Sequence, residues 1–210
     1  MGSNNKLIKI MYILIILFSW TSIFSLIAVK TDSQIVKLWK EIAVIAFYIL
    51  SIMYLFRTKK IGAKKVLISI VIPVYIFVFY ILTSMEDNRI LVFYQFKTDI
   101  IPFLFPFAMY CIIETQEQAH KIYRGLCNVF IFIGITNAIF VFIERIFTTW
   151  FLVFLEIDNL NNQSGKSGLR LDNTSDGLRA MGTMTSFINS GTLMILSIFI
   201  LLESGIFNKK

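Results

Sequence analysis

Long apolar runs without charges, separated by short polar segments, make up most of the chain. The run from Ile10 to Val29 has twenty residues, which as a helix would rise about 30 Å and cross the hydrocarbon core of a bilayer. Runs from Leu38 to Phe56 and from Val66 to Ser84 predict a second and a third membrane span. Pro73 lies inside the third, and a membrane helix tolerates such a proline where a neighbouring group satisfies the carbonyl that it leaves without a donor.

The next two apolar runs predict a short fourth span and a regular fifth one. Ile100 to Ile113 contains only fourteen uncharged residues, so the fourth span has to begin near Phe93 in order to cross. We expect Pro102 and Pro106 to kink or thin this helix near its start. Leu126 to Ile143 is long enough to form the fifth span without help from its neighbours.

The longest region that does not cross follows the fifth span. Within it, Ile146 to Leu155 is apolar and aromatic but too short to cross, so we expect it to lie in the interface or to re-enter the membrane. A polar stretch from Glu156 to Gly182 precedes the sixth predicted span, Met184 to Leu202. The chain therefore divides into a five-span bundle over residues 1–143, an outer loop over 144–183, and a sixth span with a tail over 184–210.

Composition agrees with this division. Hydrophobic residues make up 57% of the 210 positions and charged residues 16%, and the mean hydropathy is +0.74. A soluble domain of this size needs more polar surface, and an aromatic share of 15% excludes a disordered chain. The predicted fold is an all-α polytopic membrane helix bundle of about six transmembrane helices.

The net charge of +7 is interpreted as orientation and not as a sign of nucleic-acid binding. The densest cationic segment, Arg57 to Lys65, is expected to be cytoplasmic because lysine and arginine gather in cytoplasmic loops. Both termini then lie in the cytoplasm and the outer loop faces outward. With this topology eleven cations fall inside, namely Lys6, Lys9, Arg57, Lys59, Lys60, Lys64, Lys65, Lys121, Arg124, Lys209 and Lys210, against eight outside.

The sequence offers no pattern for a metal or another cofactor, and we expect none. Its one histidine, His120, falls in a cytoplasmic loop without other ligand types in a recognisable spacing. Cys111 and Cys127 fall near the inner ends of spans four and five, where a reducing cytosol disfavours a disulfide, so we interpret both as small packing residues.

Two groups of polar residues at the outer side are candidates for chemistry. Glu144 and Arg145 are neighbours that point about 100° apart on a helix, so at least one is expected to face the bundle. The pair either anchors the end of span five at the interface or makes Arg145 one wall of an outward cavity. The outer loop carries Lys166, Arg170 and Arg179, and a guanidinium close to a helix start suits an anion such as phosphate, although a solvated arginine is the alternative.

The first half of span six is rich in small and polar residues. Gly182, Ser186 and Ser190 recur every four residues, a spacing that allows close helix approach, and Asn189 needs a hydrogen-bond partner in a span. This pattern fits either a tight helix interface or the lining of a polar cavity open to the outer face.

The segment from Leu178 to Thr183, running into this span, resembles the start of the core domain of bacterial O-antigen polymerases and ligases. The matching residues are Arg179, Gly182 three positions later, and Asn189 in a small and polar helix start. The acidic turn from Glu114 to Glu117 and the span that ends in Glu144 are also similar in layout. The resemblance covers about residues 90–205.

The resemblance implies a polymerase of surface-polysaccharide repeat units that acts on undecaprenyl-pyrophosphate-linked glycans at the outer face of the bacterial cytoplasmic membrane. It implies catalytic roles for Arg179 and Arg170, which would stabilise the pyrophosphate leaving group without a metal. It further implies substrate-binding roles for Arg145, Lys166, Gly182 and Asn189. Expected partners are the lipid-linked oligosaccharide, the bilayer and other glycan-assembly membrane proteins.

Family members carry about twice as many spans, so this chain is expected to match the N-terminal half of one and to lack activity alone. An O-antigen ligase fragment and a non-enzymatic membrane protein, such as a transporter subunit, remain alternatives.

Overall fold

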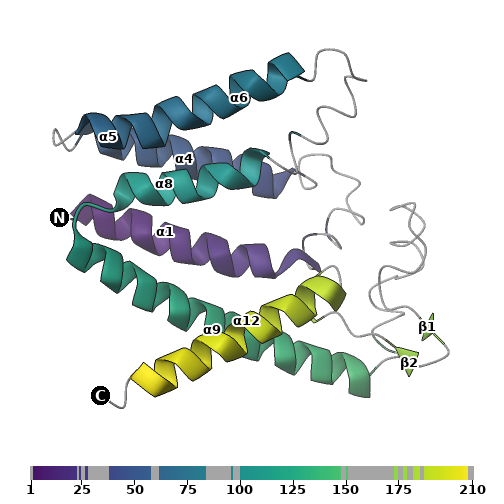
Figure 1. Cartoon of the computed structure of the whole chain (residues 1–210). Coiled ribbons are helices and arrows are strands. Elements are labelled where there is room, and N and C mark those ends of the chain that lie inside the picture. The colour runs from purple at the N-terminus through teal and green to yellow at the C-terminus, as the bar shows by residue number, and fades with distance from the viewer. Residues whose placement is uncertain are drawn as a thin grey trace. The chain divides into compact units, whose positions relative to one another are not determined.

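The structure is a computed structural model of the chain, and its described residues form helices, short turns and one pair of two-residue strands (Figure 1). By contacts the chain divides into two compact units. Unit 1 comprises residues 1–14 and 38–122, and unit 2 comprises residues 15–37 and 123–210. The described residues are 2–22, 24, 27, 38–57, 62–83, 96, 100–147, 150, 173–174, 177–178, 182–184 and 187–207.

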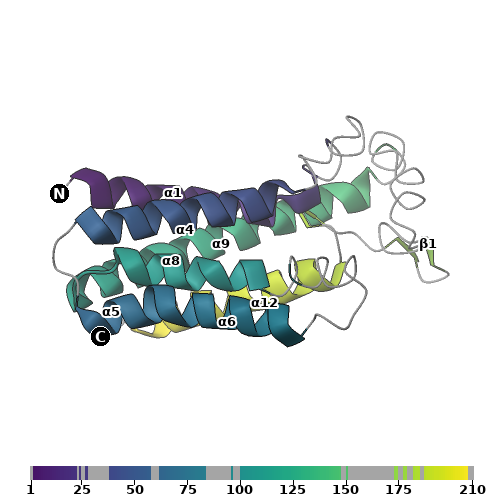
Figure 2. The ribbon, with the colours of Figure 1, turned by 90° about the horizontal axis from the view of Figure 1, so that it is seen from above.

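Unit 1 is built from helices that lie side by side along their lengths (Figures 1 and 2). Phe47 of α4 stacks against Phe105 of α8, with ring centroids 5.3 Å apart. Aromatic and aliphatic side chains from facing helices form its core. Its elements are the first part of α1 (Gly2–Ser19), α4 (Trp39–Arg57), α5 (Ala63–Val66), the π-helical turn η1 (Leu67–Val71), α6 (Ile72–Thr83), the 3₁₀ turn η3 (Ile101–Phe103) and α8 (Leu104–Ile112).

Unit 2 contains the end of α1, most of α9 (Gln116–Ile146) and α12 (Phe187–Phe207). In sequence, β1 (Asn173–Thr174) and β2 (Gly177–Leu178) come after α9 and before α12, and the two strands pair antiparallel.

Among the residues that the structure describes, three helices are long and apolar enough to cross a membrane, which supports the predicted class of helical membrane protein. They are Trp39–Arg57, Ala63–Leu82 and Gln116–Ile146. An apolar stretch of 18 residues in the second helix has a mean hydropathy of 2.4, but only 11% of this stretch is buried within the protein. A helix that is apolar all round and left uncovered needs an apolar solvent, and lipid provides one.

Several helices begin or end away from the limits that hydropathy predicts. The first begins at Gly2 and not at Ile10, so the exposed Lys6 and Lys9 lie on it. The helix expected from Leu126 begins at Gln116, and the one expected from Met184 begins at Phe187. Most of the predicted interfacial segment lies outside the described residues.

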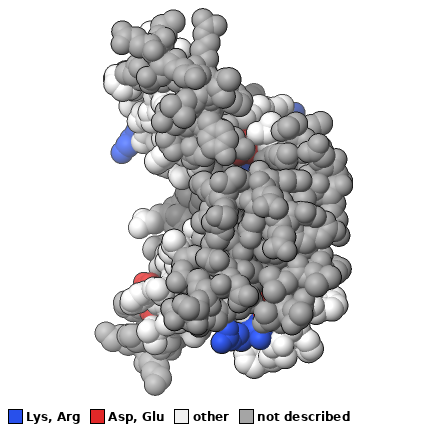
Figure 3. Space-filling model, turned by 90° about the vertical axis from the view of Figure 1, so that its right-hand side faces the viewer, with Lys and Arg blue, Asp and Glu red and all other residues white. Residues whose placement is uncertain are grey.

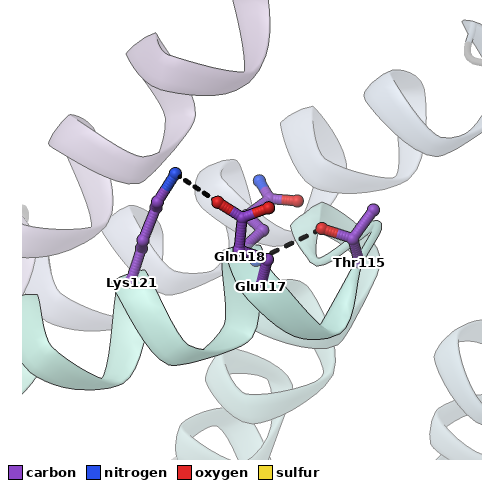
Figure 4. A network of polar contacts seen from close by, with 4 residues as sticks. All are labelled: Thr115, Glu117, Gln118 and Lys121. Carbon is purple, nitrogen blue, oxygen red and sulfur yellow. Dashed lines mark hydrogen bonds and ion pairs between the residues drawn. The ribbon is translucent and has the colours of Figure 1, made fainter.

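A capping motif explains the early start of α9. The backbone N–H of Gln118 donates to Thr115 Oγ1 (3.2 Å; Figure 4). The Gln118 side chain in turn accepts from the N–H of Glu114 (2.9 Å). These bonds satisfy donors that the first helical turn leaves without partners. One turn on, Lys121 forms an ion pair with Glu117 at 2.8 Å. A helix with a capped start does not need an apolar run to begin.

Pro73 and Pro102 act as the sequence predicts, while Pro106 lies within the continuous helix α8. In an α-helix the carbonyl of Ser69 would accept from residue 73, which as Pro73 has no N–H. The hydroxyl of Tyr48 donates to that carbonyl at 2.5 Å, so a neighbouring helix supplies the missing donor and the expectation is confirmed. At Pro102 the fourth apolar segment begins as a 3₁₀ turn before α8 continues it, which is the thinning expected near its start.

Candidate functional site

The turn that leads into α12 is fixed from several sides in unit 2. Gly182 has a left-handed backbone (φ +63°), and its N–H donates to Glu144 Oε2 at 2.8 Å. A Cβ on Gly182 would lie 2.3 Å from Asn137 Oδ1, so both the conformation and the space require glycine here. This single bond joins residues 38 positions apart and closes the base of the long segment between them.

Asn137 holds the next residue of the same turn. Its side chain is fully buried, and Oδ1 accepts from both the N–H (2.9 Å) and the hydroxyl (3.0 Å) of Thr183. Its Nδ2 donates to Ser190 Oγ at 2.7 Å. One amide of α9 thus binds both the turn and the first part of α12.

Two residues that follow α1 complete this arrangement. Ser22 donates to the carbonyl of Thr183 through its N–H (3.1 Å) and its hydroxyl (2.9 Å). Trp20 packs edge-on against Phe140 of α9, with ring centroids 5.2 Å apart. We call the group of Ser22, Asn137, Glu144, Gly182 and Thr183 the Thr183 clasp.

The contacts of the clasp continue along α9 and α12 at a spacing of seven residues. From Asn137 toward the start of α9, the carbonyl of Phe130 accepts a hydrogen bond from Ser197 Oγ (2.9 Å), and the hydroxyl of Tyr123 donates to the carboxylate of Glu203 (3.3 Å). The contacting positions on α9 are Tyr123, Phe130, Asn137 and Glu144, and those on the other side include Thr183, Ser190 and Ser197. Figure 1 shows α9 and α12 crossing each other.

Gly134 lets the two helices approach closely. A Cβ added to it would lie 2.4 Å from both Cβ and Oγ of Ser197, so no larger residue fits without movement. Small residues of this kind are typical of helix pairs in membranes, where close backbone approach replaces the hydrophobic effect as the driving force.

Beside this contact lies a groove with a volume of about 220 Å³, lined by Gly134, Ile135, Ala138, Met194 and Ile198 among others. Its walls are almost entirely apolar. It lies along the second half of span six, whereas the polar cavity lining was one interpretation of the first half of that span.

The structure brings together only part of the predicted site. Of the pair at the end of α9, Glu144 is buried (3% exposed) whereas Arg145 is exposed, so it is the carboxylate that faces inward. Gly182 is in the clasp, while Asn189 is exposed and its neighbour Ser190 faces α9.

The three predicted outer-loop cations, Lys166, Arg170 and Arg179, lie outside the described residues. The strands β1 and β2 lie between Arg170 and Arg179 in sequence, with Asn173 opposite Leu178 and Thr174 opposite Gly177.

Asn137 and Thr183 are the residues that sequence reasoning missed. The pattern seen in the sequence was a four-residue repeat, whereas the contacts recur every seven residues along α9 and, opposite it, at Thr183, Ser190 and Ser197. Aligning the polar residues of spans five and six by that longer repeat would have found them.

The clasp holds the turn before α12 against the end of α9, and its buried side chains are closed to a ligand. Its side chains at Asn137, Glu144 and Thr183 are at most 3% exposed, and their hydrogen bonds within the clasp join one part of the protein to another. In the part of the chain that the structure describes, no three His, Cys, Asp or Glu residues gather as a metal site would require. On the face shown in Figure 3, the charges of described residues form small separate patches.

Comparisons of the chain with models of protein families, with curated proteins and with solved structures find no match.

Proposed function

We propose that this chain belongs to a membrane-embedded polymerase of surface-polysaccharide repeat units, which acts on undecaprenyl-pyrophosphate-linked glycans at the outer face of the bacterial cytoplasmic membrane. In this proposal six helices cross the bilayer and both termini are cytoplasmic. The outer loop between the fifth and sixth spans binds the lipid-linked oligosaccharide.

The observation that carries the proposal is the hydrogen bond between Gly182 and the buried Glu144. It fixes the glycine of the arginine-to-glycine motif on which the family resemblance rests, at the base of the outer loop. Arg179 stands three positions before this fixed turn. A cation needed at a defined place relative to the membrane gains from such an anchor, whereas a merely solvated arginine does not.

The transfer step explains why several cations are useful. Moving a glycan from its lipid carrier to an acceptor hydroxyl breaks the bond to the pyrophosphate, and negative charge develops on the departing group. Arg179 and Arg170 stabilise that charge, with Arg145 and Lys166 in support, because preorganised cations stabilise developing charge without a metal. The antiparallel pairing of β1 and β2 reverses the chain between the two catalytic arginines, which favours their action on one anion.

Glu144 is not the general base in this proposal. Its carboxylate is 3% exposed and already accepts a hydrogen bond from the backbone, so an acceptor hydroxyl has no access to it. It acts by holding the turn.

The test is the length distribution of surface glycans in a strain that lacks the gene and carries variants of it. Loss of the gene should leave glycans of a single repeat unit, and Arg179→Ala should reproduce that loss, with activity reduced about a hundredfold or more. Arg179→Lys keeps the charge but not the forked donors, and should restore only short chains. The control is Arg124→Ala, an exposed cation near the opposite end of α9, which should give normal chains.

Two outcomes would remove the polymerase proposal. One is a normal glycan ladder with Arg179→Ala at wild-type protein abundance. The other is accumulation of long glycans that remain on the lipid carrier when the gene is lost, since that result identifies a ligase. No change in any glycan on loss of the gene would favour a non-enzymatic membrane protein.

A further inference from the structure

A polar cluster joins several helix ends of unit 1. The carboxylate of Glu114 accepts hydrogen bonds from Tyr54, near the end of α4, and from Asn4, near the start of α1 (3.3 Å). Lys65 of α5 donates to the carbonyl of Ile113 at 2.6 Å. The start of α1, the end of α4, α5 and the start of α9 therefore meet at one end of the unit, as Figures 1 and 2 also show.

Exposed cations surround this cluster. Lys6 lies two residues after Asn4, Arg57 three after Tyr54, and Lys64 directly before Lys65. We call Lys6, Lys9, Arg57 and Lys64 the cationic rim. All four are exposed, and none forms an ion pair within the described residues.

The carboxylates near the rim do not balance its charge. In the described part of this end, Glu114 is bound by hydroxyl and amide groups, and Glu117 is paired with Lys121 at 2.8 Å. The rim therefore keeps a net positive charge, while the Glu117–Lys121 pair adds none.

The rim lies at the ends of helices that are long enough to cross a membrane, and the ends of such helices meet the lipid headgroups. The membrane-length helix Trp39–Arg57 ends at this end of the unit, and Ala63–Leu82 and Gln116–Ile146 begin there. When these helices cross the hydrocarbon core, long cationic side chains at their ends reach the phosphate layer.

We propose that the cationic rim is a binding surface for anionic phospholipid headgroups, to which Arg57 at the end of α4 and Lys64 of α5 both contribute. The proposal is independent of any role in glycan assembly, because it depends only on the charge and position of unit 1. Lipids with a net negative headgroup, such as phosphatidylglycerol, are enriched beside these side chains over zwitterionic ones.

The test uses the full chain in nanodiscs of phosphatidylcholine that contain a trace of spin-labelled phosphatidylglycerol or, in a matched sample, of spin-labelled phosphatidylcholine. The fraction of each probe that the protein immobilises gives the association constant of the anionic lipid relative to the zwitterionic one. The wild-type chain should prefer the anionic lipid, and R57Q/K64Q should lower this preference by about fivefold for each cation removed at low ionic strength. The charge-conserving R57K/K64R should restore it.

The matched control is E117Q/K121Q, which also changes two residues at this end but leaves the net charge as it was. It should keep the wild-type preference. Equal loss in this control, or an unchanged preference in a folded R57Q/K64Q protein, would overturn the proposal. Displacement of the lipid by millimolar inorganic phosphate, with no difference between the two lipids, would also overturn it, because the surface would then be a site for free anions.

Discussion

Asn137→Ala is the substitution that tests the Thr183 clasp most sharply. The change removes three hydrogen bonds, two to Thr183 and one to Ser190, with lengths of 2.7–3.0 Å. Hydrogen bonds between membrane helices contribute on average about 0.6 kcal/mol each and at most about 1.7 kcal/mol. The three together give about 2 kcal/mol, and the Thr183 N–H left buried without an acceptor adds about 1–3 kcal/mol.

We therefore expect Asn137→Ala to lower the free energy of unfolding by about 3–5 kcal/mol. The assay is reversible unfolding of the purified chain in mixed micelles of a mild detergent and dodecyl sulfate, followed by helical circular dichroism. The control is Asn128→Ala, an exposed asparagine on the same helix, which should be neutral or slightly stabilising because alanine favours a helix.

A double-mutant cycle isolates one of the three bonds. Combining Asn137→Ala with Ser190→Ala should give a coupling of about 0.6–1.7 kcal/mol for the bond of 2.7 Å. If Asn137→Ala costs no more than Asn128→Ala, or if the coupling is zero, the buried amide does not hold α12 to α9 and the reasoning is refuted.

Two further substitutions test helix packing by the same unfolding assay. Gly134→Ala should destabilise the protein by about 1–3 kcal/mol, because its new Cβ would lie 2.4 Å from Ser197. The control Gly191→Ala meets open space and should stabilise α12 slightly. Equal effects of the two substitutions would contradict the close approach of α9 and α12 at Gly134. Tyr48→Phe should cost about 1 kcal/mol by removing the donor to the carbonyl at the proline of the third apolar segment, and Tyr75→Phe, at an exposed tyrosine, should cost nothing measurable. A Tyr48→Phe protein as stable as the wild type would show that this carbonyl needs no donor.

Hydropathy predicted the class of the fold because the energy of a lipid-facing helix depends mainly on its composition. The Ala63–Leu82 helix is so apolar that no detail of packing is needed to recognise it. Helix ends were less predictable, since they depend on local hydrogen bonds outside the hydrocarbon. The early start of α9 follows from Thr115 and Gln118, a capping pattern that the sequence contains but that hydropathy does not register.

The clasp was harder to predict because its partners are far apart along the chain. Asn189 and Asn137 look alike in sequence, since each is an amide in an apolar run. Asn189 was expected to need a partner, yet it is exposed, and it is Asn137 that binds a residue 46 positions away. Which of two asparagines faces a neighbouring helix depends on helix rotation and register, and these come from long-range packing.

The most direct test of the proposed polymerase is product analysis with the purified full-length polymerase to which we assign this chain, reconstituted in liposomes with lipid-linked single repeat units. Released polyprenyl pyrophosphate and glycan length are measured in the same reaction. The expected result is that each released carrier is matched by one added repeat unit, and that Arg179→Ala abolishes both while the protein stays folded. Glycan extension unaffected by Arg179→Ala, or no release of carrier by the wild-type protein, would contradict the proposal.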